Sequence, residues 1–126
     1  MKILSPKREA SEMREEILKK LKTFGLGDYE SRVYFTLQVN GKTKAGMLWK
    51  EAGVPQSKIY YLLDALEMKG LVEQTQRNPR EVRAKSFLRF ANEYLTEKKI
   101  LLREIDESIK ENKYLLKGFR RRRVFS

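Results

Sequence analysis

The 126-residue sequence contains neither cysteine nor histidine. Without them it has no disulfide, thiolate nucleophile or imidazole base, and nearly every zinc site of ordinary composition is excluded. A carboxylate-only metal site or acid–base pair stays open in principle. The acidic residues, however, lie mostly beside lysines and arginines at helical spacing, which is typical of a solvated face. We therefore expect a protein that is not an enzyme and that has no metal site and no cofactor.

Long apolar runs are missing too. No segment approaches the roughly 20 apolar residues of a transmembrane helix. The run Ile3-Leu4 near the N-terminus is too short for a secretory signal. We expect a cytoplasmic protein without a membrane partner.

Positive charge is abundant and unevenly placed. The chain has 28 basic and 17 acidic residues, a net charge of +11, which favours a polyanionic partner such as nucleic acid. Residues 87–117 are almost neutral, with seven basic and six acidic side chains, whereas residues 118–126 hold four arginines and no acid. This distribution fits a nucleic-acid footprint on the first 86 residues followed by a neutral interaction helix.

The first 52 residues read as three helices. The first begins at Pro6 or Ser11 and ends near Gly25, because proline suits the first helical position and glycine the end. Its apolar positions are Met13, Ile17, Leu21 and Phe24. The second has Asp28 as its N-cap. Its apolar positions are Val33, Phe35, Leu37 and Val39, with Tyr34 beside them.

A short third helix is expected between residues 44 and 52, after a stretch that suits a single β-bridge. We expect Thr43 to cap this helix, and Met47 and Leu48 to be buried with Trp49 at the edge. Gly53 closes it, and Pro55 opens the next helix about two residues later. Such a tight connection is typical of a helix-turn-helix.

The helix after Pro55 has one apolar stripe. It consists of Ile59, Leu62, Leu63 and Leu66, at helical spacing. The remaining face is able to bond phosphates and base edges in a major groove. Its candidate DNA-binding residues are Gln56, Ser57, Lys58, Tyr60 and Tyr61. The alternative is an ordinary surface helix, although two adjacent tyrosines cannot both be core.

Two strands are expected after Gly70, at residues 71–75 and 81–85, joined by a loop with the turn signal Asn78-Pro79. Arg77 and Arg80 in this loop suit contact with a minor groove or its phosphates. The alternative is that loop arginines only keep the protein soluble. Lys44, before the short third helix, completes the candidate DNA-binding set.

From residue 87 onward the pattern becomes a heptad repeat. The repeating seam positions are Leu88, Leu95, Leu102, Ile109 and Leu116, and Ile105 lies on the second seam with Ala91, Lys98 and Asn112. This predicts one helix over 87–117, roughly 30 residues and about 45 Å long. Too long to be covered by so small a domain, it should pair with a second copy in a homodimer. The alternative partner is the first helix of the same chain.

We expect three parts: a DNA-binding domain at 1–86, a coiled-coil-like dimerisation helix at 87–117 and a basic tail at 118–126. The tail holds four consecutive arginines at 120–123. It is either an arm on DNA phosphates or a solvated end. The expected fold class is mainly α with a small β-hairpin, a winged helix-turn-helix with a long C-terminal dimerisation helix.

Three segments resemble the TrmB-like family of archaeal transcriptional regulators. They are Phe24-Gly25-Leu26 with Asp28-Tyr29-Glu30-Ser31-Arg32-Val33-Tyr34, then Gly53-Val54-Pro55-Gln56-Ser57-Lys58-Ile59-Tyr60, and Leu66-Glu67-Met68-Lys69-Gly70-Leu71-Val72. The resemblance covers about residues 15–86. It implies a winged helix-turn-helix that binds operator DNA, with Ser57, Lys58 and Tyr60 on matching positions. Gln56 stands where the family often has arginine.

The resemblance does not extend to ligand sensing, because sugar-sensing members have a substantial C-terminal effector domain and this sequence continues only as the long helix and tail. We therefore predict a homodimeric, sequence-specific regulator that binds double-stranded DNA and takes no small-molecule ligand. One alternative is an architectural protein that binds DNA without sequence preference. The other is a winged helix that contacts a partner protein.

Overall fold

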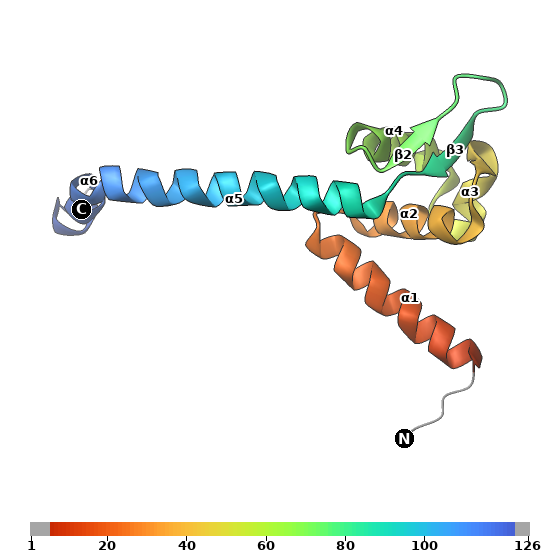
Figure 1. Ribbon diagram of the computed structural model, residues 1–126, viewed down its shortest axis with the longest axis horizontal. Coiled ribbons are helices and arrows are strands. Elements are labelled where there is room, and N and C mark those ends of the chain that lie inside the picture. The colour runs from red at the N-terminus through yellow and green to blue at the C-terminus, as the bar shows by residue number, and fades with distance from the viewer. Residues whose placement is uncertain (1–5, 123–126) are drawn as a thin grey trace. The chain divides into compact units, whose positions relative to one another are not determined.

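The computed structural model describes residues 6–122, and the side chains of residues 9–115, 117 and 118 (Figure 1). It divides into two units, with the boundary between Phe90 and Ala91. Helix α5 (Phe87–Glu111) runs through this boundary.

The first unit is built mainly from helices. They are α1 (Pro6–Thr23), α2 (Asp28–Asn40), α3 (Ala45–Ala52), the short 3-10 turn η1 (Gln56–Lys58) and α4 (Ile59–Met68). Helix α2 contacts α1, α3 and α4, so it lies at the centre of this unit. Of the two predicted starts for the first helix, Pro6 is the one found.

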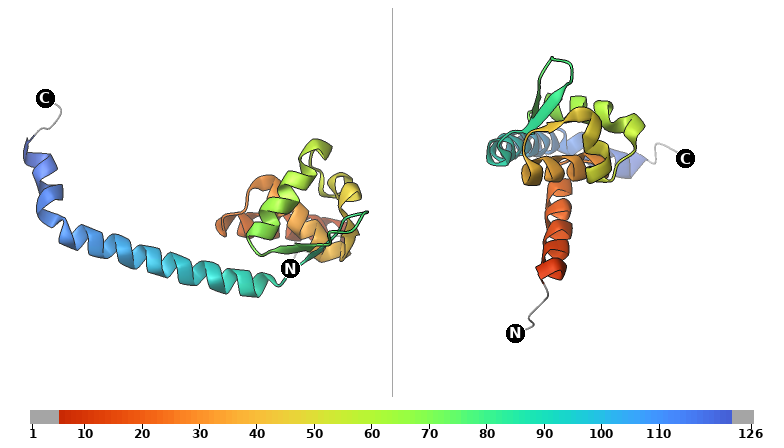
Figure 2. Two further views of the ribbon diagram at one scale, coloured as in Figure 1. Left: turned by 90° about the horizontal axis from the view of Figure 1, so that it is seen from above. Right: turned by 90° about the vertical axis from the view of Figure 1, so that its right-hand side faces the viewer.

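A three-stranded antiparallel sheet completes the unit, in the order β1–β3–β2. Its strands are β1 (Thr43–Lys44), β2 (Val72–Gln74) and β3 (Glu81–Ala84). The predicted hairpin is β2–β3, and the expected bridge at 42–44 is the short strand β1, in which Thr43 lies opposite Val82. The hairpin loop extends beyond the helices (Figures 1 and 2). The predicted fold class of mainly α structure with a small β-hairpin is confirmed.

The core of this unit is formed by side chains from its helices and from the hairpin. The helix after Pro55, formed by η1 and α4, is called the reading helix below. Its predicted apolar stripe is buried along the whole length, since Ile59, Leu62, Leu63 and Leu66 are each at most 6% exposed. They pack with Leu18 and Leu21 of α1, Val33 and Leu37 of α2, Leu48 of α3 and Val72 and Val82 of the hairpin. The winged helix-turn-helix therefore has one continuous core.

Four predicted core positions are wrong. Met13, Ile17, Val39 and Met47 are all exposed. In α2 the cause is the period: 33, 35, 37 and 39 alternate as on a strand, whereas a helix returns to the same face after three or four residues. Thr36 takes a buried place instead, and its hydroxyl donates to the Arg32 carbonyl at 2.8 Å.

Two predicted helix caps are also wrong. The N-cap of α2 is Gly27, whose N–H donates to the Glu30 carboxylate at 2.9 Å, and Asp28 is the first helical residue. The N-cap of α3 is Lys44, because the Thr43 hydroxyl donates back to the Gly41 carbonyl at 2.9 Å. The Asp28 carboxylate pairs instead with the side chains of Lys22 and Arg32, and the Thr43 hydroxyl bonds to a neighbouring backbone carbonyl.

The second unit holds the rest of α5 and helix α6 (Lys113–Arg122). The prediction of one uninterrupted helix over 87–117 is wrong, because the helix breaks at Asn112. The Asn112 side-chain amide donates to the Ser108 carbonyl at 2.8 Å, a local bond by which asparagine competes with a regular helix. The Leu116 side chain and the four arginines at 120–123 lie outside the described side chains.

No residue of α5 is buried. Its exposed apolar side chains include Leu88, Leu95, Leu102, Ile105 and Ile109, which are the predicted seam positions within this helix. Within residues 6–122, no helix is long and apolar enough to cross a lipid bilayer. The described side chains also contain no cluster of three or more carboxylates placed to hold a metal ion.

Candidate nucleic-acid interface

The turn between α3 and α4 is as tight as the sequence predicts. Gly53 ends α3 in the left-handed conformation, with φ +71°, and its N–H donates to the Trp49 carbonyl. Residues other than glycine rarely adopt this conformation because their Cβ crowds the following carbonyl. Pro55 follows at φ −62° and opens the next turn. The chain thus reverses within about two residues.

The first turn of the reading helix differs from the expected α-helix. Residues Gln56 to Lys58 form the 3-10 turn η1, in which the Lys58 N–H donates to the Pro55 carbonyl at 3.0 Å, and α4 begins at Ile59. Such turns are frequent at helix N-termini. Gln56, Ser57 and Lys58 are all exposed on it. Their side chains are presented to solvent by a defined backbone.

The two adjacent tyrosines behave differently. Tyr61 is 75% exposed, on the side of α4 opposite the buried stripe. Tyr60 is half exposed, and the guanidinium of Arg80 lies 5.0 Å from its ring centroid. Its hydroxyl lies over Gly46 of α3, where an added methyl group would be 3.4 Å away. Tyr60 is therefore held by the protein on two sides.

Helix α2 braces the turn through residues that the sequence analysis did not single out. Arg32 donates to the Gly53 carbonyl at 3.1 Å and pairs with Asp28 at 3.2 Å. Arg32 and Lys58 also face the ring of Tyr29, at 5.9 and 5.3 Å from its centroid. The hydrogen bond to Lys22 holds the pKa of Asp28 below its usual value, with Arg32 adding to the effect.

The same helix holds the far end of α4 and the end of the β2–β3 hairpin (Val72–Ala84), which is the wing of this fold. Glu30 pairs with Lys69 at 2.8 Å, just after α4. The Tyr34 hydroxyl donates to the Lys85 carbonyl at 2.7 Å, just after β3. Burial raises the pKa of the Tyr34 phenol. These contacts explain the segment that resembles the family: its residues fix the turn, the helix end and the wing from one side.

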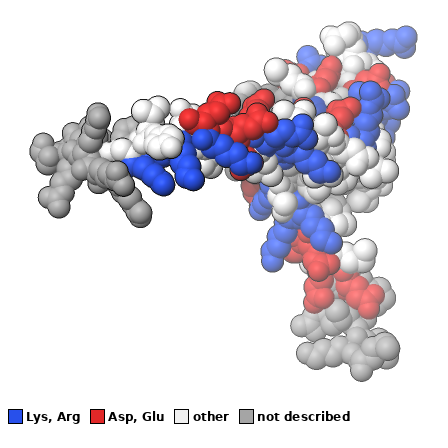
Figure 3. Space-filling model, turned by 60° about the vertical axis from the view of Figure 1, so that its left-hand side comes forward, with Lys and Arg blue, Asp and Glu red and all other residues white. Residues whose placement is uncertain are grey.

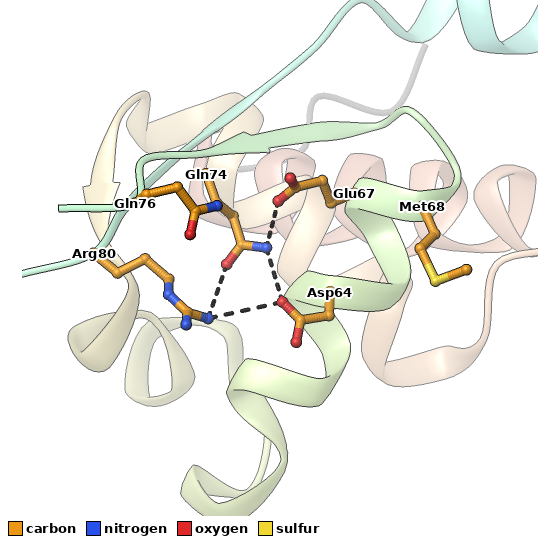
Figure 4. A pocket seen from close by; sticks show the side chains of 6 residues that line it. All are labelled: Asp64, Glu67, Met68, Gln74, Gln76 and Arg80. Atoms are coloured by element: carbon orange, nitrogen blue, oxygen red, sulfur yellow. Dashed lines mark hydrogen bonds and ion pairs between the residues drawn. The ribbon is translucent and has the colours of Figure 1, made fainter.

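The two wing arginines have different surroundings. Arg77 is exposed in the loop between β2 and β3. Arg80 is half buried and turned toward α4, where it approaches Asp64 and Gln74 (Figure 4). Lys44 is exposed on β1, whose partner is β3. The predicted residues thus lie on η1, α4, β1 and the loop between β2 and β3, and Lys58, Tyr60 and Arg80 among them have partners within the protein.

Charge alone does not outline the site. On the face shown in Figure 3, basic and acidic side chains are interleaved rather than separated into one continuous patch. The net charge of +11 favours a polyanion in general. The exposed residues of η1 and of the loop between β2 and β3 therefore indicate a candidate nucleic-acid contact more clearly than the charge does.

A tight helix-turn-helix followed by a hairpin wing defines the class of protein, a winged helix-turn-helix. The family model described as "Sugar-specific transcriptional regulator TrmB" matches residues 21–87. The chain belongs to this family, as its sequence segments indicated.

Two curated relatives match the same part of the chain. The HTH-type sugar sensing transcriptional regulator TrmBL1 of Pyrococcus furiosus is 46% identical over 68 residues, which are 54% of this chain and 20% of that protein. The uncharacterized protein YrhO of Bacillus subtilis is 36% identical over 58 residues, or 46% of this chain and 21% of that protein. The chain thus matches about a fifth of the length of these relatives.

Solved structures share the fold more widely. TrmBL2, described as an archaeal chromatin protein with a novel mode of DNA binding, has a TM-score of 0.74 at 21% identity, over 90% of this chain and 44% of that one. The transcriptional regulator Tm0710 of Thermotoga maritima has a TM-score of 0.52 at 21% identity, over 94% of both chains. At these identities the likeness establishes the fold.

Proposed function

We propose that this protein is a homodimeric regulator of transcription that binds a specific sequence of double-stranded DNA in the cytoplasm. The observation that carries the proposal is the reading turn: Gln56, Ser57 and Lys58 are exposed at the start of a helix that α2 braces through Arg32. TrmBL1, a relative in the matched region, is described as a transcriptional regulator. The proposal includes no sugar effector, because the match covers only a fifth of that protein.

The proposed contacts follow from exposure and chemistry. Gln56, Ser57 and Tyr61 face base edges in the major groove, and Gln56 is able to bond adenine N6 and N7 together. Lys58 and Lys44 lie on phosphates, and Arg77 anchors the wing on the flanking backbone. Tyr60 and Arg80 are held by Asp64, Gln74 and each other, so we leave them out of the DNA contacts that the sequence predicted.

The proposed dimer forms along α5. A 25-residue helix with no buried residue leaves its apolar stripe in water, and such a stripe is stable when a second helix covers it. The seam residues are Leu88, Leu95, Leu102, Ile105 and Ile109, with Leu116 of the predicted repeat beyond them. Paired helices would set the two reading turns about one DNA turn apart, roughly 34 Å.

Selection of bound duplexes from a random pool tests sequence recognition and spacing together. The expected result is a motif with two half-sites about 10 base pairs apart. Gln56→Ala should then lose discrimination at one base pair of each half-site, about 1–3 kcal/mol. A pool that shows no enriched motif after competition with bulk DNA contradicts sequence-specific binding.

Sedimentation of the purified chain tests the dimer. Leu102→Glu places a carboxylate on the seam and should give a monomer at micromolar concentration. Thr96→Glu places the same group on the same helix, one position beyond a seam residue, and should leave the mass unchanged. A wild-type chain that sediments as a monomer, alone and on DNA, excludes this interface.

The second candidate is an architectural protein that covers DNA without sequence preference. It is favoured by the description of TrmBL2 as a chromatin protein and by the net charge of +11. Such binding depends on phosphate contacts and carries no base information. Binding that is equal for every duplex of the same length, with a steep salt dependence, would establish this candidate in place of the first.

A further inference from the structure

We infer that Arg80 is a positioning residue that fastens the wing to the reading helix, and that Arg77 is the wing arginine that meets DNA. The inference rests on the proposed function for its DNA part. Its structural part stands on the contacts around Arg80, a residue of the wing whose side chain turns toward α4 rather than outward (Figure 4).

The Arg80 side chain has partners on both α4 and β2. Its Nη1 atom lies 3.7 Å from Asp64 Oδ1 and donates to Gln74 Oε1 at 3.4 Å. Its guanidinium also covers the ring of Tyr60, one turn before Asp64. A planar, delocalised cation suits this combination of ring contact and hydrogen bonds, whereas lysine does not.

Gln74 closes the network. Its amide donates to Asp64 Oδ1 at 3.0 Å and to Glu67 Oε2 at 2.5 Å, so one β2 side chain connects two carboxylates on successive turns of α4. Asp64, Glu67, Gln74 and Arg80 border a hollow of about 320 Å³ together with Met68 and Gln76. In Figure 4 the four polar side chains converge, whereas Met68 points away from them.

The backbone of Arg80 also holds the wing against the helices. Its carbonyl accepts a hydrogen bond from the Ala45 N–H at 2.9 Å, where α3 begins. Arg80 therefore joins the wing to α3 through its main chain and to α4 through its side chain. These are the two helices of the helix-turn-helix.

The charges around Arg80 also separate it from Arg77. The carboxylate of Asp64 faces its guanidinium directly, and that of Glu67 faces it through Gln74. A cation that is already paired releases few counterions when DNA binds, so it contributes little to the salt dependence. Arg77 lies exposed in the loop and should contribute about one phosphate contact.

The matched variants Arg80→Gln and Arg77→Gln separate the two roles. On a duplex that the wild-type chain binds, Arg77→Gln should make the slope of log K against log salt shallower by about one. Arg80→Gln should bind about fivefold more weakly at every salt concentration with the slope unchanged. Asp64→Asn should weaken binding similarly, and the double variant should lose less than the product of the two losses.

A measurement without DNA keeps the inference independent of the proposed function. Amide hydrogen exchange of the β2–β3 pairs and of the Thr75 N–H should quicken in Arg80→Gln and Asp64→Asn, but not in Arg77→Gln. If the wild-type chain binds no duplex at low salt, the proposed function fails. The exchange measurement still tests whether Arg80 holds the wing against the reading helix. Unchanged exchange in both Arg80→Gln and Asp64→Asn, or a slope for Arg80→Gln as shallow as that for Arg77→Gln, overturns the inference.

Discussion

Replacing Tyr34 by phenylalanine tests whether α2 holds the wing. The change removes one buried hydroxyl and keeps the ring, which packs near Phe87 at 6.2 Å between centroids. The hydroxyl donates to the Lys85 carbonyl at 2.7 Å and accepts from the Gln38 amide at 2.6 Å. Its loss therefore removes the link between α2 and the end of β3 without opening a large cavity.

The magnitude follows from these two bonds. Each is worth about 1 kcal/mol net, and an acceptor left buried without a donor costs about 1–3 kcal/mol. The Gln38 amide lies 3.3 Å from the same Lys85 carbonyl and is able to take over part of the role. We therefore expect Tyr34→Phe to lower the free energy of unfolding by about 1–2 kcal/mol.

Urea unfolding at one protein concentration measures this loss, and Tyr29→Phe is the matched control. Tyr29 also lies on α2, half buried, and the described residues give its hydroxyl no hydrogen-bond partner. Its replacement should change the free energy of unfolding by less than about 0.5 kcal/mol. Equal effects of the two substitutions would refute the brace.

The pH dependence gives a second check on Tyr34. Burial raises its pKa above the ordinary value of 10.0, so the folded state holds the phenolic proton more strongly than the unfolded chain does. The associated stability is fully present below pH 10 and is lost as the pH rises through the folded pKa. The difference between wild type and Tyr34→Phe should therefore shrink above pH 10.

Three further changes test the core, the turn and the charge at the start of α2. In urea unfolding, Leu63→Ala should cost about 2–5 kcal/mol because Leu63 is fully buried, whereas Met68→Ala on the opposite face should cost less than about 0.5 kcal/mol. Gly53→Ala should cost about 1–2 kcal/mol, read from the same curves, because its φ of +71° crowds a Cβ. Asp28→Asn should be less stable than wild type at neutral pH. In acid titration the difference should begin to shrink near pH 3.8, the ordinary pKa of aspartate, and vanish once the pH falls below the lower folded pKa, because the hydrogen bond to Lys22 lowers the pKa of Asp28 in the folded state.

The sequence predicts well where several local signals agree. Gly53, Pro55 and the stripe from Ile59 to Leu66 specify a stop, a start and a buried face, and the structure has all three. The sequence predicts helix ends poorly where a polar side chain can bond either to the helix terminus or to another nearby group. Asp28, Thr43 and Asn112 each bond to a group that the helical pattern did not identify, and the caps and the length of the long helix differ as a result.

The candidate site also has parts that the sequence predicts and parts that it does not. Exposure of Ser57 and Tyr61 follows from helical periodicity, because they lie opposite the buried stripe, whereas Gln56 lies three residues before the buried Ile59 and is exposed at the start of the 3-10 turn η1. The brace by Arg32 and the pairing of Arg80 with Asp64 join residues 21 and 16 positions apart in the chain. No local pattern indicates which of several arginines forms such a contact. Only the folded chain reveals that the family-like segment on α2 is a support for the turn and the wing.

The side chains of Gln56 and Ser57 have no hydrogen-bond or ion-pair partner among the described residues, although their backbone is fixed, since the Lys58 N–H donates to the Pro55 carbonyl and the Ile59 N–H to the Gln56 carbonyl. A substitution at either position disturbs neither the core nor the brace. Under the proposed function, variation at these two positions changes the DNA sequence that is preferred while the fold stays intact, so closely related copies diverge in their targets after few mutations.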